Sequence, residues 1–295
     1  MKATRALVAL LTIPAALSLA ACGGGSSGVS NITGQAASIR FVDGSPDAGT
    51  VDLYYVPTGQ TRGATPTVAN AAFGTIGDFQ TEALTAGQVF VYPAGTSTTP
   101  LGISCNVPQL ANNAKYSVVI SGQVAKGTAQ CTLFQDFDYT ANGQVRVHHA
   151  SPAAAAAGLS TVAFGFYTPP FVPTATIGVA GTATFPGFTA PGGPPQASFA
   201  STGVTNVTTT TSPIGVAIGQ NPASATNTFN GIAAIDAAKF VNPGTATQSN
   251  TAGTIPGGGF NNASIFAVDC GTNASTPQGS ACTSGVGLIG TFDSK

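Results

Sequence analysis

His148 and His149 are the only two histidines in a chain of 295 residues, and imidazole is the side chain best suited to acid–base chemistry near neutral pH. The pair ends an alternating run, VRVHH, that is typical of a strand. Because adjacent strand residues point to opposite faces, the two rings cannot easily ligate one metal ion or activate one nucleophile. A Ser–His–Asp triad stays open, since serine is abundant, but the pattern favours structural histidines. We predict no catalytic residue and no enzyme activity.

Asp43, Asp47 and Asp52 bring carboxylates together in one short stretch, and oxygen ligands of this kind suit calcium. Their spacing does not fit an EF-hand loop, and the matching turn later in the chain has no acidic residue. Capping of turns is the simpler interpretation. No phosphate-binding loop precedes a predicted helix, so nucleotide binding has no support. We predict no metal and no cofactor.

Cys105, Cys131, Cys270 and Cys282 form an even set, which suits disulfides in an exported chain. Four cysteines allow three pairings. Proximity along the chain favours Cys105–Cys131 and Cys270–Cys282. Zinc is the alternative, but no Cys-x-x-Cys and no nearby histidine accompanies these residues.

The fifth cysteine, Cys22, follows what reads as a signal peptide at residues 1–21. Lys2 and Arg5 precede an apolar stretch that is too short to span a bilayer, and small residues precede the cleavage point. The run Leu-Ala-Ala-Cys at 19–22 resembles a bacterial lipobox, which implies cleavage before Cys22 and acylation of its thiol. Several acyl chains on one residue suffice for stable anchoring. An ordinary secretory signal with a chance cysteine is the alternative.

Gly23 resembles the Gram-negative signal for release to the outer membrane, and residues 22–35 include a Gly/Ser-rich tether. We therefore expect a lipid-anchored protein of the bacterial outer membrane, facing the periplasm or the cell surface. Only 6% of the residues are charged, so the chain lacks the Lys/Arg density that nucleic acid requires. The expected partners are the membrane, through the lipid, and an envelope or extracellular protein or glycan.

An eight-residue template occurs twice, as IRFVDGSP at 39–46 and VRVHHASP at 145–152. A second pair of landmarks follows in the same order, NNAKYSVV at 112–119 and NNASIFAV at 261–268. After each of these two landmarks, a Gly-rich connection leads to a cysteine, so that Cys131 and Cys282 fall at corresponding places. Such ordered self-similarity predicts two tandem modules.

The modules are expected at 36–141 and 142–295, the second with a Gly/Pro/Thr-rich insertion at about 168–258. Short β-rich runs bounded by turns predict all-β, immunoglobulin-like antiparallel sandwiches. The expected strands are 37–42, 51–56, 88–92, 101–105, 116–121, 130–134, 145–149, 161–167, 214–218, 264–269 and 286–292. The run GIAAIDAAKF at 231–240 is the one stretch that suits a short helix.

The stretch IRFVDGSPDAGTVDLYYVPTG at 39–59 resembles the domain-of-unknown-function family number 4397. Members of that family often carry His-Ala-Ser-Pro at a strand end, which stands here at 149–152, and YSVVISG at 116–122 resembles their closing strand. The resemblance is good over about 36–135 and weaker over 145–292. It implies exported or surface-attached bacterial β-domains, often in tandem, and implies no activity.

The repeated template has a geometric interpretation, carried by Ser45 and Pro46 and again by His149, Ser151 and Pro152. Proline cannot donate to a strand ladder, and the preceding serine can close a local turn, so Ser-Pro ends the first strand of each module. We expect a non-catalytic structural or interaction protein of the envelope or cell surface. An adhesin or glycan-binding protein that uses the loops of the second module is the alternative, and a secreted hydrolase is a weaker one.

Overall fold

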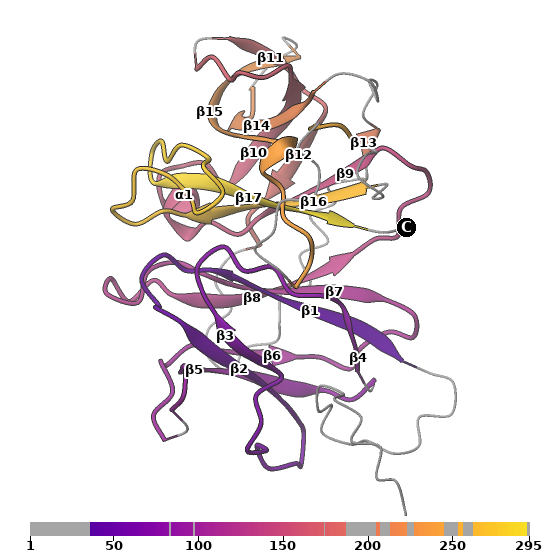
Figure 1. Ribbon diagram of the computed structural model, residues 1–295, viewed down its shortest axis with the longest axis vertical. Coiled ribbons are helices and arrows are strands. Elements are labelled where there is room, and N and C mark those ends of the chain that lie inside the picture. The colour runs from indigo at the N-terminus through magenta and orange to yellow at the C-terminus, as the bar shows by residue number, and fades with distance from the viewer. Residues whose placement is uncertain are drawn as a thin grey trace, which may run out of the picture.

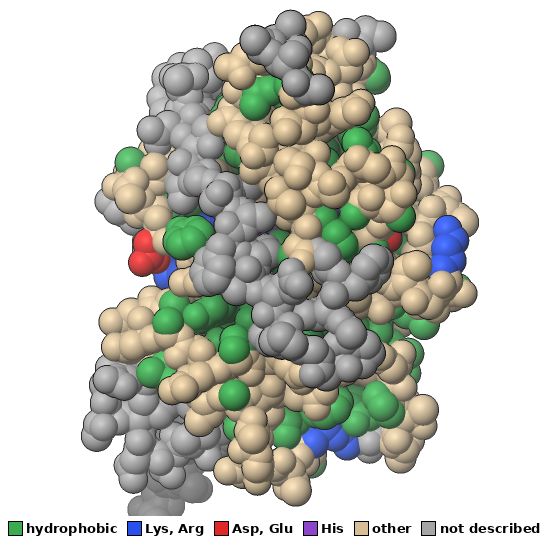
Figure 2. Space-filling view, turned by 180° about the vertical axis from the view of Figure 1, so that it is seen from behind, with side chains coloured by type: hydrophobic (Ala, Val, Ile, Leu, Met, Phe, Trp, Pro, Cys, Tyr) green, Lys and Arg blue, Asp and Glu red, His purple; other side chains and the backbone are tan. Residues whose placement is uncertain are grey.

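The computed structural model describes residues 36–82, 84–96, 98–173, 175–186, 205–206, 213–222, 227–244, 253–255 and 262–293. Within these ranges four β-sheets stack into two sandwiches, one below the other in Figure 1. Seen from behind, the surface carries few charged side chains, as the low overall charge requires (Figure 2). No helix of the described residues is both long and apolar enough to cross a bilayer.

The first sandwich has an inner sheet ordered β4-β1-β7-β8 and an outer sheet ordered β3-β2-β5-β6. Its strands are β1 (Ala37–Gly44), β2 (Val51–Pro57), β3 (Val68–Ala71), β4 (Gln80–Glu82), β5 (Gly87–Pro93), β6 (Ser104–Val107), β7 (Lys115–Ser121) and β8 (Gln130–Asp136). Ile39, Leu53 and Val118 are fully buried in the core between the two sheets. The alternation of each strand supplies this core from one face only.

The second sandwich repeats this topology. Its inner sheet is β13-β9-β16-β17 and its outer sheet is β11-β15-β14-β10-β12. The elements are β9 (Gln144–His149), α1 (Pro152–Ala156), β10 (Thr161–Tyr167), β11 (Thr176–Gly178), β12 (Gly181–Thr184), β13 (Thr205–Asn206), β14 (Gly215–Gln220), β15 (Thr228–Asp236), the 3-10 helix η1 (Ala237–Lys239), β16 (Asn262–Asp269) and β17 (Val286–Asp293). Strand β11 is the addition; every other strand has a counterpart at the same place in the first sandwich.

The two inner sheets pack against each other, face to face (Figure 1). One apolar cluster joins residues of both sandwiches: Val42, Ile76, Val119 and Phe134 from the first, and Ala150, Phe266, Val268 and Ile289 from the second. The approach of the sheets is close, because a Cβ atom added to Gly44 would lie 2.5 Å from a methyl carbon of Val268. The strand faces that point away from each sandwich core therefore form a second buried layer.

The all-β sandwich prediction is confirmed, with one refinement. Strand β1 pairs with β7 in parallel, and β9 pairs with β16 in parallel, so each inner sheet is mixed. A parallel neighbour needs a long crossover, which the outer-sheet strands provide in both modules. Hydrophobic alternation does not reveal strand direction, so these parallel pairs could not be predicted from it.

Two expectations about the second module hold only in part. The run at 231–240 is the end of strand β15 followed by η1, since its alternating Ile232, Ala234 and neighbours serve a sheet. The described part of 168–258 includes β14 and β15, whose Val216, Ile218 and Ile235 are buried in the sandwich core. This stretch therefore supplies the outer sheet and is no dispensable surface insertion.

The internal repeat also has a different register from the one predicted. Asp43 pairs with Ile120 in the first module, and the equivalent His149 pairs with Ala267 in the second. Residues 115–121 thus match 262–268, two positions away from the alignment of the Asn-Asn-Ala turns. An error of two residues preserves the strand face, which is why the apolar pattern did not expose it.

Candidate functional site

Three polar residues of the first module form a hydrogen-bonded row. They lie on its inner sheet, on the face that points away from the core of this module. The Nε of Arg40 donates to Ser117 Oγ at 2.6 Å, and this hydroxyl donates to Asp136 Oδ2 at 2.7 Å. The strands β1, β7 and β8 lie side by side and contribute one residue each. The row faces the second module, because alternation turns Ile39 and Phe41 toward the core of the first.

The second module has the same three residue types at the equivalent positions, Arg146, Ser264 and Asp293, but Arg146 Nε has no hydrogen-bond partner among the described residues. The strand registers match Arg40 with Arg146, Ser117 with Ser264, and Asp136 with Asp293. Ser264 Oγ donates to Asp293 Oδ2 at 2.5 Å.

Two ion pairs connect these rows across the interface between the modules. Arg40 NH1 donates to Asp293 Oδ1 at 2.8 Å, and Arg146 NH1 lies 3.2 Å from Asp136 Oδ1. The arginine of each module therefore forms an ion pair with an aspartate of the other. Such reciprocal contacts define an isologous interface, here between two halves of one chain.

These ion pairs are almost fully buried, with Arg40 0%, Arg146 2%, Asp136 3% and Asp293 4% exposed. Burial alone would raise the pKa of Asp136, but Arg146, Arg40 and His148 outweigh it and lower that pKa well below the usual range. For Asp293 burial is likewise outweighed, by Arg40 and Arg146, and the pKa is lowered. Both carboxylates are ionised, so the two arginines and two aspartates are balanced in charge.

The two histidines lie on opposite faces of β9. The His148 ring stacks on Phe266 at 4.9 Å between centroids, and its Nε2 is 2.8 Å from Asp136 Oδ1. Burial lowers the pKa of His148, and the nearby arginines add to this although Asp136 opposes it, so the ring is neutral at pH 7. His149 points into the second sandwich, where its Nε2 lies 2.7 Å from the Leu159 carbonyl oxygen. Burial lowers the pKa of His149 to about 4.

Beside the ion pairs a hollow of about 430 Å³ opens at the seam between the modules. Its floor includes Tyr139, whose hydroxyl lies 2.6 Å from Asp293 Oδ2 and whose ring lies 4.3 Å from the guanidinium carbon of Arg146. Burial and Asp293 raise the pKa of Tyr139 well above its usual value. Lys115, at the rim, pairs with the exposed Asp138 at 3.1 Å. In the lining of this hollow Tyr139 and Asp293 are hydrogen-bonded to each other, whereas Arg146 Nε is buried without a hydrogen-bond partner among the described residues, and a solvated ion pair lies at the rim.

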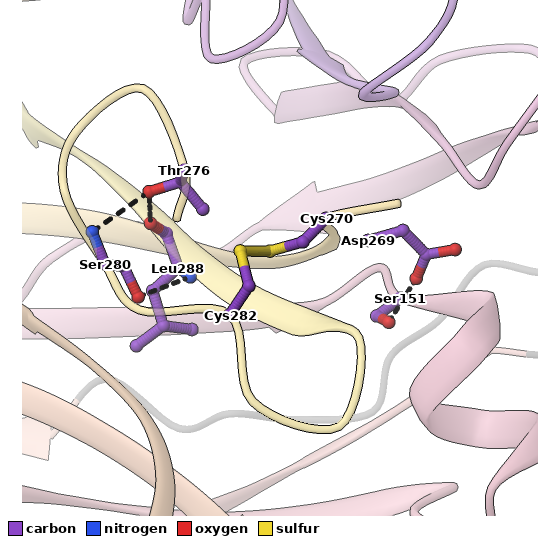
Figure 3. The surroundings of a disulfide bond; sticks show 7 residues. All are labelled: Ser151, Asp269, Cys270, Thr276, Ser280, Cys282 and Leu288. Atoms are coloured by element: carbon purple, nitrogen blue, oxygen red, sulfur yellow. Dashed lines mark hydrogen bonds between the residues drawn. A yellow bond between two sulfur atoms is a disulfide. The ribbon is translucent and has the colours of Figure 1, made fainter. Parts of the chain in front are cut away.

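The Ser-Pro template ends the first strand of each module, and its serine binds the same place in both. Ser45 Oγ donates to the carbonyl oxygen of Gly122 at 2.8 Å, and Ser151 Oγ donates to the carboxylate of Asp269, the residue equivalent to Gly122 (Figure 3). Each bond ties the strand end to the exit of its parallel neighbour. Ser-Pro thus follows the end of the first strand in each module, but Ser45 bonds a distant strand end and does not close the local turn that was expected.

In the second module Ser151 also begins a helix. Its Oγ accepts from Ala154 N–H at 3.1 Å, and Pro152 occupies the first turn of α1. Serine before proline at a helix start is a favourable cap, because proline has no amide hydrogen to lose. The alanine-rich run that follows was not predicted as helical.

Serine, histidine and aspartate meet at this turn, but their order is not that of a catalytic triad. Ser151 Oγ bonds directly to Asp269, while His149 Nδ1 lies 3.3 Å from the backbone N–H of Ser151. The imidazole thus cannot take the proton of the hydroxyl. All three residues are at most 1% exposed, so a substrate cannot reach the hydroxyl.

Both disulfides favoured by chain proximity are present. Cys105–Cys131 joins β6 of the outer sheet to β8 of the inner sheet, and Cys270–Cys282 closes the loop between β16 and β17 (Figure 3). The expected correspondence of Cys131 with Cys282 is wrong, because Cys131 matches Leu288 in the strand register. The two bridges are thus unrelated additions to one scaffold.

Asp43, Asp47 and Asp52 do not converge. Asp47 accepts from the backbone N–H groups of Val124 and Ala125, and Asp52 accepts from those of Asn70 and Gly95. Asp43 accepts from Ser45 N–H, and burial raises its pKa to about 7. Within the described residues no group of three His, Cys, Asp or Glu side chains is placed to hold a metal ion. Cys22, the predicted lipidation site, lies outside the described residues.

Residues 37–158 match the model of the family described as Domain of unknown function (DUF4397). This part of the chain is similar to that family. The match runs from β1 through β9 and α1, so it includes both copies of the Ser-Pro template and both arginines of the interface. No curated protein matches the chain.

Sequence reasoning missed the residues at the interface between the two modules. A signal was present, because arginine stands second in both copies of the template, in a strand whose other alternating positions are apolar. A buried arginine needs a carboxylate partner. The partners Asp136 and Asp293 lie at the ends of β8 and β17, far along the chain, and only the strand pairing brings them to the arginines.

Proposed function

We propose that this chain is a non-catalytic bacterial lipoprotein that presents two fused β-sandwiches as one rigid interaction body. The observation that carries the proposal is the reciprocal pairing of Arg40 with Asp293 and of Arg146 with Asp136. Breaking either pair would leave a buried charge unpaired, which is costly, so the modules resist separation. A rigid body of this kind suits a structural or binding role.

The acid–base groups support a non-catalytic role. His148 and Asp136 belong to the interface, and His149 and Ser151 are buried at the template turn. A general acid or base must reach the proton of a substrate, and these groups face protein on every described side. Low charge argues against nucleic acid as partner. An envelope or extracellular protein or a glycan fits the neutral, hydroxyl-rich surface better.

Anchoring is tested by protease treatment of intact cells that express wild type or Cys22→Ser. If Cys22 is acylated, wild type stays in the outer-membrane fraction. The variant lacks the thiol that carries the lipid and is therefore lost from this fraction. Digestion of wild type on whole cells would place the body on the surface, whereas protection until the outer membrane is opened would place it in the periplasm. A variant that remains membrane-bound would overturn the anchoring proposal.

A second candidate function is an adhesin or glycan-binding protein that uses the second module. Tyr167 and Phe171 favour it, since their rings are partly exposed, lie 5.3 Å apart and line a hollow of about 250 Å³ with the exposed Val172. Deleting 168–258 cannot test this candidate, because the deletion would remove β14 and β15 from the sandwich. Phe171→Ser is the sharper test, and unchanged attachment of cells would contradict this candidate.

A further inference from the structure

A second, larger hollow of about 600 Å³ lies along the seam between the modules, within the range of small-ligand sites. One wall is β3 and the connection from β3 to β4, at 67–80. The other wall is made by 241–244 and by the tip of the disulfide-closed loop, Pro277 and Gln278. It meets the hollow beside the ion pairs at Asp78, which lines both.

Backbone contacts fix the two walls relative to each other. Gly244 N–H donates to the carbonyl oxygen of Ile76 at 2.7 Å, across the seam. Gly74 has φ of 90° and comes so close to Pro277 that an added Cβ would lie 3.1 Å from its ring. The hollow is therefore formed by the packing of the modules, and neither module makes it alone.

The chemistry of the lining is neutral and rich in hydroxyl and amide groups. Thr67, Asn70, Thr75, Gln80 and Gln278 supply these groups. Asp78, which is exposed, is the one charged residue of the lining, and Phe73 adds a partly buried aromatic ring. Amide and hydroxyl groups both donate and accept, as sugar hydroxyls do, whereas an anionic ligand would find no cation here and one carboxylate.

Gln278 supplies an independent sign of a ligand. It is 6% exposed, and its Oε1 accepts from Gly290 N–H at 2.8 Å, which fixes the side-chain amide. Its Nε2 is buried and has no hydrogen-bond partner among the described residues. A buried donor without a partner is costly to maintain, and since Nε2 exposes almost no surface, a small shift of the side chain is needed for a ligand oxygen in the hollow to satisfy it.

The loop that carries Gln278 is held rigidly. Cys270–Cys282 closes it, Thr276 Oγ1 donates to the Leu288 carbonyl oxygen at 2.9 Å, and Leu288 N–H donates to Ser280 Oγ at 3.0 Å (Figure 3). These bonds tie the loop to β17 on both sides of Gln278. A binding group held this way costs little entropy to order when a ligand arrives.

We propose that this seam hollow binds a neutral oligosaccharide, with Gln278 Nε2 donating to a sugar oxygen, Asn70 bonding hydroxyls and Phe73 contacting an apolar sugar face. An added peptide strand fits less well. Although β3 is a sheet edge, it has four residues, a register shift against β2, and Asn70 at φ of 56°. The site rests on the proposed non-catalytic role and gives it a ligand class.

The test uses the full-length purified protein on a printed array of neutral hexose and N-acetylhexosamine oligosaccharides beside anionic glycans. Calorimetric titration of the retained neutral glycan then compares wild type with Gln278→Glu, which keeps the acceptor for Gly290 but replaces the donor. We expect Kd to rise at least tenfold in this variant. The matched control Gln220→Glu, at an exposed position on β14, should bind as wild type does.

Asn70→Gly provides a second variant at an exposed position, and because glycine adopts the φ of 56° of this residue without strain, a folding defect cannot imitate loss of binding; Kd should rise severalfold. The proposal would be overturned if the array retained no neutral glycan or if neither variant of the seam hollow changed Kd. Binding of a strand-forming peptide instead of a glycan would also overturn it. Mass spectrometry of the recovered glycan separates the two proposals. A shortened glycan would contradict the non-catalytic role and leave the site standing, whereas absent binding leaves the Cys22→Ser result unaffected.

Discussion

The guanidinium of Arg40, in the first strand of the first sandwich, donates at 2.8 Å to the carboxylate of Asp293, at the end of the last strand of the second. Arg146 and Asp136, at the equivalent positions, repeat the pair in the opposite direction at 3.2 Å. The relation between the two halves of the chain is therefore that of a two-fold dimer made covalent. Each half buries a face that it would otherwise expose.

Arg40→Met tests how strongly this interface holds the modules. The substitution removes the direct ion-pair partner of buried Asp293 and a second partner of buried Asp136, at 3.3 Å, and such losses cost about 3–5 kcal/mol. We expect denaturant unfolding to show a loss of this size in the free energy of unfolding. Because Arg146 has the equivalent place, Arg146→Met should produce a loss in the same range.

Lys115→Met is the matched control, since the Lys115–Asp138 pair is partly solvated, with 33% and 70% of the side chains exposed. Exposed pairs contribute at most about 1 kcal/mol. A loss for Arg40→Met no larger than that of the control would show that water or relaxation replaces the partner. The ion pairs of the interface would then not be what holds the two modules together.

Removing both members of the pair should cost less than the single losses together. In Arg40→Met combined with Asp293→Leu neither charge is left unpaired, and apolar replacements for buried ion pairs are often tolerated. Asp293 also accepts from Ser264 and Tyr139, so part of the loss will remain. A double-mutant cycle measures the coupling, and strict additivity would contradict a direct interaction between Arg40 and Asp293.

The alternation in strands such as 37–42, 51–56 and 161–167 was enough to predict the all-β sandwiches, because one apolar face per strand is what a two-sheet core requires. The repeat was also visible in the Ser-Pro template. Position 40 illustrates the limit of such reasoning. Its arginine sits on the face opposite to Ile39 and Phe41, and alternation assigns that face to solvent unless a second module covers it.

Other features needed information that no local pattern contains. The partners of Arg40 and Arg146 are separated from them by long stretches of chain, so only strand pairing defines the cluster. The Gly/Pro/Thr-rich character of 168–258 resembles loop sequence, yet β14 and β15 lie within it and pack Val216 and Ile235 into the core. Gln278 carried no motif, and its proposed role follows only from a buried side-chain nitrogen, Nε2, that lacks a hydrogen-bond partner among the described residues.

The raised pKa of Asp43 predicts that the free energy of unfolding falls as pH rises. Burial raises its folded-state pKa to about 7 from the ordinary value of 3.8, so the folded state binds the proton more tightly than the unfolded chain. Stability is therefore fully present below pH 4 and lost as pH rises through 7, by up to about 4 kcal/mol. Asp43→Asn keeps the acceptor for Ser45 N–H and should raise the unfolding free energy at pH 8. Equal pH profiles for wild type and variant would contradict this account.

His149 occupies the equivalent position in the second module and predicts the opposite trend. Burial lowers its folded-state pKa to about 4 from 6.5, so the unfolded chain binds the proton more tightly. Stability is present above pH 6.5 and is lost as pH falls through 4, by about 3 kcal/mol. The wild type should therefore lose more unfolding free energy between pH 7.5 and pH 4 than His149→Gln. An acid loss of equal size in both proteins would assign it to other groups, such as His148.

The two disulfides separate stability from ligand binding. Cys270 and Cys282 are 12 residues apart and Cys105 and Cys131 are 26 apart, so loop-closure entropy predicts a loss of about 3 kcal/mol for replacing either pair by alanine. Only the loop between Cys270 and Cys282 carries Gln278. Calorimetric titration at low temperature, where both variants stay folded, should show glycan binding weakened at least tenfold in Cys270→Ala/Cys282→Ala and unchanged in Cys105→Ala/Cys131→Ala. Equal binding by the two variants would show that the loop needs no covalent closure, and the rigidity assigned to Gln278 would then come from its hydrogen bonds to β17 alone.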